Sequence, residues 1–420
     1  MSLIRPFAGL RPCAGRAAEV AAPPYDVLNT AEARQQAQGK PWSFLHISKP
    51  EIDLPEGTDP YAPEVYAKAA ENLARMLASG VLARDDAPCY YAYRLIMGGH
   101  EQTGLVAAAS VADYDTNRIR KHEFTRPDKE DDRVRQIEAL DAQTGPVLLA
   151  YPAAPAVDAI LAEASAGTPD ADLTAPDGIR HSIWFIRDTG TLATLTTAFD
   201  VLPALYIADG HHRSAAASRV AAARRAAGCG PEDASQTFLS VIFPHHQMQI
   251  LDYNRVVKDL NGLGPVQFLV RLSKAFVVTP ANEAVKPACP GEFGLYLAGR
   301  WHKLSIRPER IPTEDPVARL DVSLLSDNLL GPILGITDLR RDKRIDFVGG
   351  IRGLSELERR VDSGEMAVAF SLHPTRMEDL MAVADANQVM PPKSTWFEPK
   401  LADGLVSQVL GWEPVGLKRS

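Results

Sequence analysis

Cysteine is scarce in this sequence, and the four cysteines lie too far apart to share a site. Cys13, Cys89, Cys229 and Cys289 form no CxxC pair. This spacing excludes a zinc knuckle and a disulfide scaffold, so we expect reduced thiols. The chain has no apolar run near the ~20 residues that cross a bilayer, and its first residues lack a signal-peptide core. These absences predict a cytoplasmic protein without a membrane partner.

An excess of basic charge is also missing. The net charge of −8 argues against a general affinity for nucleic acid, whose phosphates reward basic surfaces. The motifs GxxxxGK[ST] and GxSxG are absent, which excludes a P-loop and a hydrolase nucleophile elbow. What remains is a 420-residue chain with 45% hydrophobic and 23% charged residues. That composition is typical of a globular protein with two or three domains.

Strand-like and helix-like segments are mixed along the whole chain, which predicts an α/β (mixed α+β) fold. Gly98-Gly99-His100 is typical of a hairpin turn between two β-rich runs. The pattern starts afresh after Asn261. We therefore predict a core domain over residues 1–260 and a C-terminal α/β domain over 261–420. Predicted strands include 43–47, 147–151, 202–207 and 238–243, and predicted helices include 61–83, 214–227 and 323–334.

The most informative segment is Ala208-Asp209-Gly210-His211-His212-Arg213, between a short apolar strand and an alanine-rich helix. Asp209 is a candidate N-cap, and Gly210 allows a sharp turn. Two imidazoles and a guanidinium then share the first helical turn with unpaired backbone N–H groups. Such a terminus attracts anions, and an arginine forks onto phosphate oxygens, so we predict a phosphate pocket. The alternative is a capped helix whose histidines face solvent.

Lys121-His122-Glu123 follows a predicted strand and precedes a charged helix containing Arg133. A carboxylate beside a lysine and a histidine suits a general base, a magnesium ligand or the partner of a substrate amine. The alternative is a solvated loop. Farther upstream, Pro23 and Pro24 stiffen a turn that presents Tyr25 and Asp26.

A proline-stiffened loop near the C-terminus carries several hydrogen-bond donors that suit phosphate oxygens, namely Lys393, Ser394, Thr395 and Lys400. A surface turn with an aromatic anchor is the alternative. Histidine pairs at His211-His212 and His245-His246 raise the idea of a transition-metal site. Adjacent histidines do not easily face one ion, however, and no helical HxxxH spacing occurs, which disfavours that idea.

Taken in order, these blocks resemble a widespread bacterial and archaeal family of formerly unknown function. The matching residues cover nearly the whole chain: Ala22-Pro23-Pro24-Tyr25-Asp26-Val27, Lys121-His122-Glu123, Asp132-Arg133, Gly145-Pro146, Ala208 to Arg213, Leu320-Asp321-Val322, Met390-Pro391-Pro392-Lys393-Ser394-Thr395 and Pro399-Lys400. Two departures concern side-chain contacts. Asn254-Arg255 stands where the family often has His-Arg, and Phe124 replaces an arginine that often follows Lys-His-Glu.

The Gly-His-His-Arg element also resembles a signature of the ParB/sulfiredoxin-like fold. That resemblance implies a ParB-like core with insertions, closed by the C-terminal domain. Some relatives are similar to free-serine kinases, so it further implies a kinase of serine metabolism that moves a phosphate from ATP or ADP to free L-serine with Mg²⁺. Two rival functions stay open, namely a nucleotide-binding switch without small-molecule chemistry and a metal-dependent phosphatase or nuclease. Either a monomer or a homodimer is compatible with the sequence.

The resemblance, together with the needs of phosphoryl transfer, gives each candidate residue an expected role. The expected catalytic residues are Asp209, Glu123, His211 and His122, with Asp209 or Glu123 as the magnesium ligand. The expected phosphate and nucleotide ligands are Gly210, His211, His212, Arg213, Lys121, Arg133, Lys393, Ser394, Thr395 and Lys400. The expected substrate-binding residues are Tyr25, Asp26 and Asp321.

Overall fold

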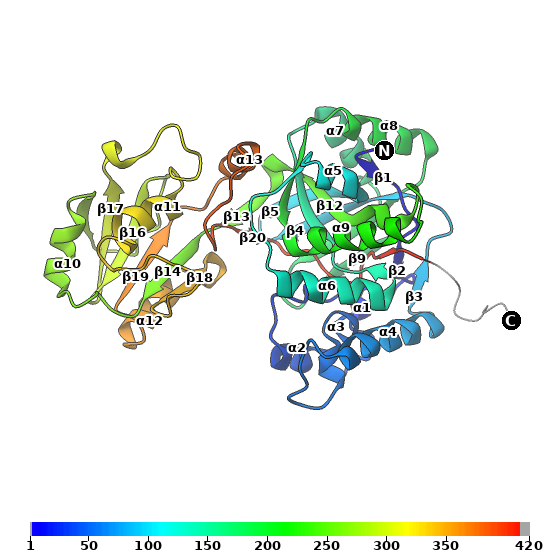
Figure 1. Ribbon diagram of the computed structural model, residues 1–420, viewed down its shortest axis with the longest axis horizontal. Helices are drawn as coiled ribbons and strands as arrows, with labels where there is room; N and C mark the ends of the chain where they lie inside the picture. Colours follow the sequence, from blue (N-terminus) through cyan, green and yellow to red (C-terminus); the bar gives the residue numbers. More distant parts are fainter. Residues whose placement is uncertain (1, 412–420) are drawn as a thin grey trace. The chain divides into compact units, whose positions relative to one another are not determined.

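The computed structural model describes residues 2–411, which form two compact units (Figure 1). The first unit contains the chain up to Met248 and again from Pro399, and the second is Gln249–Glu398. The predicted mixed α/β class is confirmed. The units follow boundaries other than those predicted, because the last segment packs in the first unit and not with residues 261–398. Among residues 2–411, no helix is both long and apolar enough to cross a bilayer.

A nine-stranded sheet forms the centre of the first unit, in the order β6-β11-β8-β12-β5-β4-β10-β9 with β1 paired to β5. The strands β8 and β12 are buried along their whole length, as expected for central strands covered on both faces. The predicted hairpin at Gly98 is present between β4 and β5. The bounds are β1 Ile4–Arg5, β4 Tyr90–Met97, β5 His100–Ser110, β6 Ile119–Arg120, β8 Val147–Tyr151, β9 Ala171–Thr174, β10 Arg180–Ile186, β11 Leu205–Asp209 and β12 Thr237–Pro244.

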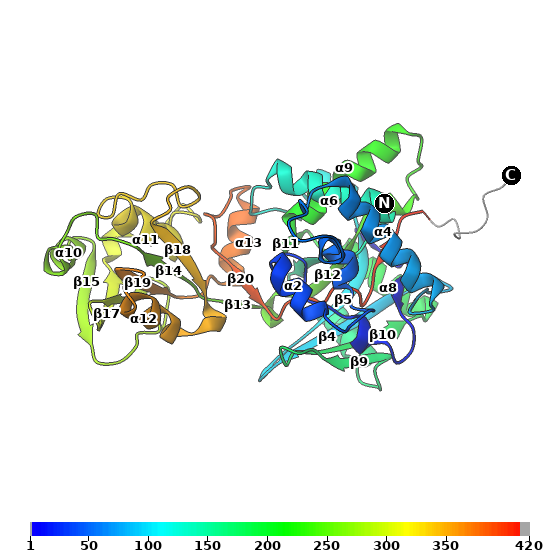
Figure 2. The same cartoon turned by 90° about the horizontal axis from the view of Figure 1, so that it is seen from below.

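Helices on this sheet share one apolar core with its strands. Side chains from α7, α8 and α9 join those of β5, β8 and β11 in a single buried cluster. Figure 1 and Figure 2 show α6 and α9 side by side, in agreement with their direct contact. The bounds are α5 Val111–Asp115, α6 Pro127–Leu140, α7 Pro155–Ala164, α8 Thr189–Asp200, α9 His211–Ala226, η2 Ala234–Gln236 and η3 His245–Gln247.

A helical part of the first unit has its own apolar core, which includes Phe44, Leu45 and Ile47. The prediction of a strand over 43–47 is wrong, because these side chains pack among helices and the segment forms the short helix α3. The helix bounds here are α1 Ala17–Val20, α2 Thr30–Ala37, α3 Leu45–Ser48, η1 Pro50–Asp53 and α4 Pro63–Ala78. Two short two-stranded sheets complete the unit: β2 (Leu10–Pro12) pairs with β3 (Leu82–Arg84), and β7 (Ala142–Gln143) pairs with β21 (Gln408–Val409).

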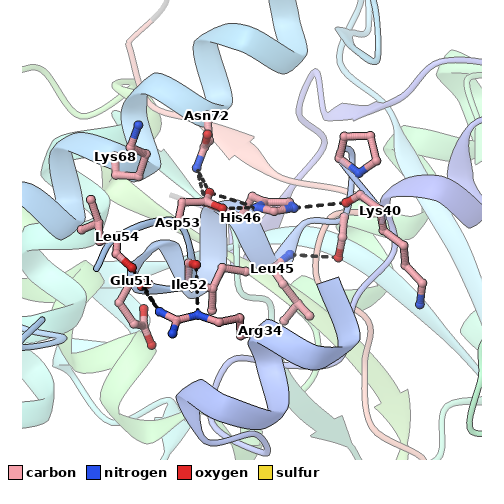
Figure 3. Close-up of polar contacts among 12 residues, drawn as sticks. Arg34, Lys40, Leu45, His46, Glu51, Ile52, Asp53, Leu54, Lys68 and Asn72 are labelled. Carbon is pink, nitrogen blue, oxygen red and sulfur yellow. Dashed lines mark hydrogen bonds and ion pairs between the residues drawn. The ribbon is translucent and has the colours of Figure 1, made fainter. Parts of the chain in front are cut away.

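Polar contacts tie α3, η1 and α4 together (Figure 3). His46 lies between the Asp53 carboxylate, 2.8 Å from Nδ1, and the Lys40 carbonyl, 3.1 Å from Nε2. The Asn72 amide donates to the carbonyl of His46 at 2.7 Å and to Asp53 at 2.8 Å. Burial favours a raised pKa for Asp53, but the hydrogen bonds and charge of His46 outweigh it and lower the pKa. These hydrogen bonds therefore have a structural role, because they hold α3, η1 and α4 against one another.

The second unit is built on a six-stranded antiparallel sheet, in the order β15-β17-β16-β19-β14-β18. The predicted helix over 323–334 is shorter, because α11 passes into a π-helical turn, η5. The bounds are β13 Gln249–Leu251, β14 Tyr253–Val257, α10 Pro265–Leu272, β15 Phe276–Ala281, β16 Glu292–Leu297, β17 Arg300–Ile306, η4 Pro308–Arg310, α11 Asp321–Leu325, η5 Ser326–Leu330, β18 Ile345–Gly349, η6 Gly350–Arg352, α12 Leu354–Asp362, β19 Val368–Leu372, α13 Met377–Asp385 and β20 Trp396–Glu398.

Candidate phosphate site at the start of helix α9

The junction between β11 and α9 differs from the sequence prediction in one respect. Asp209 ends the strand, and Gly210 occupies the N-cap position with φ of 102°. The expected N-cap role of Asp209 is therefore wrong, because the left-handed backbone at Gly210 moves the start of the helix one residue on. In the part of the chain that the structure describes, no side chain caps this end of α9. The first N–H groups of a 16-residue helix thus keep their capacity to bind an anion.

Sheet topology explains why sequence-distant residues meet at this junction. β11 runs parallel to β6, so the residues after β6, Lys121 to Glu123, lie at the same edge as the residues after β11. β8 runs antiparallel to β11, and Leu148 pairs with Asp209. The start of β8, with Gly145 and Pro146 before it, therefore lies beside the end of β11. Three of the predicted blocks are brought together by strand order alone.

Asp209 is flanked by two cations. Its Oδ2 lies 3.6 Å from Arg213 Nη2 and 3.7 Å from Lys400 Nζ. Burial favours a raised pKa for Asp209, but the charges of Lys400 and Arg213 outweigh it and lower the pKa. The carboxylate is therefore ionised at neutral pH. Because 36% of its side chain is exposed, it remains accessible to a ligand or a metal ion.

Arg213 is held from several sides and is only 10% exposed. Its guanidinium donates to the carbonyl oxygen of Pro146. A Cβ atom at Gly145 would lie 3.3 Å from Arg213 Cδ, and one at Gly210 would lie 3.1 Å from Arg213 Nε. The two glycines therefore leave the space that the arginine occupies. Burial opposes its charge, but the carboxylates of Asp209 and others raise its pKa and keep it cationic.

Beside Arg213 is a narrow pocket of about 30 Å³ whose lining includes Tyr25, Arg133 and Asp403. The Arg133 guanidinium stacks 3.9 Å from the centre of the Tyr25 ring and pairs with Asp132 at 2.7 Å. At this size the pocket holds water, so a larger ligand must displace side chains. The predicted residues Tyr25 and Arg133 therefore both lie close to Arg213. The charge of the third predicted residue, Asp26, contributes to the raised pKa of Arg213.

Asp403 is the residue at this site that sequence reasoning missed. It is 2% exposed and bridges by its backbone to Ala22, near the Pro-Pro turn. Burial raises the pKa of Asp403 to about 7, although the neighbouring Arg213 charge lowers it. The only sequence signal is its position three residues after Lys400, in a segment predicted to belong to the C-terminal domain.

His122, Glu123 and His211 form a second group at the same junction. The backbone N–H of His122 donates to His211 Nε2 at 3.3 Å, and the two rings pack edge to face with centroids 4.5 Å apart. His211 Nδ1 lies 3.9 Å from Glu123 Oε2. Burial lowers the pKa of His122 to about 4 and lowers that of His211 well below its usual value. Both imidazoles are therefore neutral at pH 7.

Two neighbours of this group have partners away from Arg213. His212 Nε2 accepts a hydrogen bond from the backbone N–H of Arg126 at 3.1 Å, which ties the first turn of α9 to the start of α6. Lys121 Nζ lies 3.9 Å from the centre of the Tyr114 ring, and burial lowers its pKa. These contacts give both side chains a structural role within residues 2–411. Their expected phosphate contacts stay predictions.

Four predicted residues belong to the second unit. Asp321 begins α11, and its Oδ1 accepts the backbone N–H of Gly291 at 2.8 Å. Ser394 is buried and donates to the Pro391 carbonyl at 2.6 Å. Arg255 is fully buried and donates to the Lys393 carbonyl at 2.8 Å, so it fixes the loop that also carries Thr395. The phosphate and substrate contacts of Asp321, Lys393, Ser394 and Thr395 stay predictions.

The raised pKa of Asp403 predicts how stability depends on pH. Because the folded state holds this proton up to about pH 7 and the unfolded chain only to about 4, the free energy of unfolding falls as pH rises through that window. Asp403→Asn removes the effect. Between pH 5 and 8 we expect its stability relative to the parent protein to rise by roughly 2–3 kcal/mol, measured by urea unfolding.

Asp172→Asn is the matched control for this experiment. Asp172 pairs with Arg180 at 2.7 Å, and the hydrogen bond from Arg180 lowers its pKa. Its charge is therefore constant between pH 5 and 8, and the variant should show no trend in that range. An equally flat difference for Asp403→Asn would contradict a carboxyl that titrates near neutrality.

Comparison with known protein families adds the classification of the chain. Residues 4–323 match the family described as "Protein of unknown function (DUF1015)". The chain belongs to this family. A search of curated proteins found no match for this DUF1015 member.

Solved structures resemble the chain only distantly. A free serine kinase in complex with AMP is 15% identical with a TM-score of 0.34, covering 72% of this chain and 92% of its own. A conserved hypothetical protein from Pyrococcus furiosus has 15% identity, a TM-score of 0.34 and coverages of 73% and 95%. SbnI with C-terminal truncation from Staphylococcus aureus is 12% identical with a TM-score of 0.29, and the match covers 72% of this chain and 86% of SbnI. At these scores the likeness carries no argument, so the functional case depends on the residues themselves.

Proposed function

We propose that this DUF1015 protein is a phosphotransferase that binds ATP or ADP at the start of α9 and passes a phosphate to the hydroxyl of a small molecule, with free L-serine as the preferred acceptor. The observation that carries the proposal is the arrangement of Asp209, Arg213 and Lys400 around an uncapped helix terminus entered through Gly210. In this proposal the β11–α9 junction corresponds to the phosphate-binding element of a ParB/sulfiredoxin-like core.

Charge neutralisation supports phosphate as the ligand. Phosphoryl transfer needs cations and backbone donors around the phosphates, and the helix terminus, Arg213 and Lys400 supply both at one place. Arg213 presents a planar fork that matches phosphate oxygens, and it is fixed before any ligand arrives by the Pro146 carbonyl. A preorganised cation loses less freedom on binding than a flexible surface lysine would.

Carboxylates at the same junction suit the remaining roles. Phosphoryl transfer also needs a divalent ion and a group that orients the attacking hydroxyl. Asp209 and Glu123 offer the oxygen ligands that Mg²⁺ prefers, and bound Mg²⁺ would neutralise phosphate charge. The ionised Asp209 is the better candidate for the general base that takes the hydroxyl proton of the acceptor molecule, because its accessible carboxylate lies beside the cations that would hold the phosphate.

The charged lining of the pocket next to Arg213 supports an amino acid as the acceptor, which must displace side chains to enter it. A zwitterion presents a carboxylate and an ammonium group close together, so its site must offer both charges. Arg133 and Arg213 supply cations, and Asp403 supplies a buried carboxyl in the same lining. Tyr25 closes the pocket over Arg133. Binding of an ammonium group at Asp403 would also offset the cost of ionising that carboxyl.

The test is a phosphoryl-transfer assay on the purified protein. ATP or ADP with Mg²⁺ is incubated with single amino acids and small alcohols, and products are identified by mass spectrometry. We expect O-phosphoserine from the parent protein and at least ~100-fold less from Asp209→Asn, the size of effect typical for a general base. Nucleotide binding without product from any acceptor would instead favour a switch, and release of inorganic phosphate or cleaved nucleic acid would favour a hydrolase.

A further inference from the structure

The imidazole of His122 has one buried ring nitrogen whose surroundings the proposed function does not explain. The residue is 2% exposed, and its Nδ1 atom is buried without a hydrogen-bond partner among residues 2–411. Its ring does bond the backbone of Ile207, so the bonded nitrogen is Nε2, and Nε2 carries the proton. Nδ1 is then left with a bare lone pair. A buried polar atom without a partner is costly, so an atom in this state calls for an explanation.

The orphaned nitrogen belongs to a group of three potential metal ligands. His122, Glu123 and His211 each offer one ligand atom, and the three atoms lie within 4.8 Å of one another. We propose that these three side chains bind a divalent transition-metal ion such as Zn²⁺, with His122 Nδ1 as one ligand. The ion would supply the missing partner of that nitrogen. This inference assigns Glu123 to the transition-metal ion, so the Mg²⁺ of the proposed phosphotransferase would be held by Asp209.

The chemistry of the donors favours a transition metal over magnesium. Two imidazoles and one carboxylate suit Zn²⁺, Co²⁺ or Ni²⁺, whereas Mg²⁺ prefers oxygen ligands alone. Imidazoles that ligate metals usually donate their other N–H to a carbonyl or carboxylate, and His122 already does so through Ile207. Tetrahedral zinc needs ligand atoms about 3.3 Å apart, so the observed 3.9 Å between His211 Nδ1 and Glu123 Oε2 requires only a small approach.

One contact must change when the ion binds. His211 Nε2 accepts the backbone N–H of His122 at 3.3 Å, which places the proton of the neutral ring on Nδ1, facing Glu123. Coordination through Nδ1 moves this proton to Nε2 at the expense of that hydrogen bond. The backbone N–H of His122 and the new Nε2–H of His211 would then be two buried donors facing each other, so this contact must open and metal binding must offset its loss. The Glu123 side chain is 51% exposed, so the group is open to an ion that arrives from solvent.

A metal titration of the full-length protein tests the proposal. After treatment with a chelator, the protein is titrated with Zn²⁺ by calorimetry and with Co²⁺ by visible absorption, which reports tetrahedral coordination. We expect one ion per chain and at least tenfold weaker binding for His122→Ala, Glu123→Gln and His211→Ala. Glu123→Gln guards against misfolding, because the side chain is half exposed. His246→Ala is the matched control, since this histidine is exposed in η3 and should leave binding unchanged.

Three outcomes would overturn the site. They are no stoichiometric ion, unchanged affinity in all three variants, or loss of binding in His246→Ala, which would assign the ion to the surface pair His245-His246. Arg213→Ala separates this proposal from the proposed function. That variant should keep metal binding while it loses nucleotide, and a protein that binds the metal without any phosphoryl transfer would leave the site standing alone.

Discussion

Replacing Arg213 with alanine should lower nucleotide affinity at least about 100-fold, a loss of about 2.7 kcal/mol of binding free energy. The expectation follows from the position of the guanidinium in the first turn of α9, 3.6 Å from Asp209 and beside the pocket that Asp403 lines. Without it, a phosphate bound at the start of α9 would lie beside the Asp209 carboxylate with one cation fewer to offset that charge, although Lys400 stays 3.7 Å from Asp209. Calorimetric titration with ADP measures the effect.

The same substitution should also lower stability. Removing one partner of a buried charge group leaves the others uncompensated, at a cost of about 3 kcal/mol in the free energy of unfolding. Arg219→Ala is the control on the same helix. Arg219 pairs with Asp131 at 2.8 Å but is 44% exposed, so its removal should cost less than about 1 kcal/mol and leave ADP affinity unchanged. Equal ADP affinity in the two variants would contradict the central role given to Arg213.

Arg213→Lys distinguishes charge from shape. Lysine keeps the positive charge but loses the planar fork and the second donor that a phosphate group uses. We expect folding close to that of the parent protein and ADP affinity between those of the parent and Arg213→Ala. The comparison is made on the same titration and unfolding curves.

The sequence predicted the strand, turn and helix of the β11–α9 junction well because their signals are local, whereas phosphate binding there stays a prediction. A short apolar strand, a glycine, three polar residues and an alanine-rich helix follow one another directly, and the structure forms β11, Gly210 and α9 from them. The error at Asp209 is one of register. Aspartate is a good N-cap by propensity, but the left-handed turn at Gly210 takes that position, and the carboxylate is turned to Arg213 and Lys400 instead.

Asp403 was missed, and a strand over 43–47 was wrongly predicted, for the opposite reason. Asp403 lies close to Arg213 although 190 residues separate them in the sequence, and a backbone bridge to Ala22 holds its segment in place. No spacing rule connects such positions. The segment around Leu45 has the composition of a strand, but it finds no strand partner and packs against helical side chains. Tertiary contacts override local preference at both places. The return of the chain to the first unit at Pro399 is likewise decided by packing.

Gly210→Ala should separate the shape of the junction from its charge. Glycine adopts φ of 102° freely here, whereas alanine would be strained by about 1–2 kcal/mol. The added Cβ would lie 3.1 Å from Nε and 3.2 Å from Cζ of Arg213, so the guanidinium must shift by a few tenths of an ångström. We expect ADP affinity to fall about tenfold, since a misplaced hydrogen-bonding group loses about 1.4 kcal/mol or more.

Gly228→Ala provides the matched control at the other end of the same helix. Gly228 also has a positive φ, 97°, but a Cβ there would meet nothing within 4 Å. Alanine at position 228 should therefore cost the same backbone strain and leave ADP affinity unchanged. If both variants lose stability equally and both keep full affinity, the close approach of Gly210 to Arg213 has no part in binding. A loss of affinity confined to Gly210→Ala would mean that the glycine is required for the position of the arginine as well as for the turn.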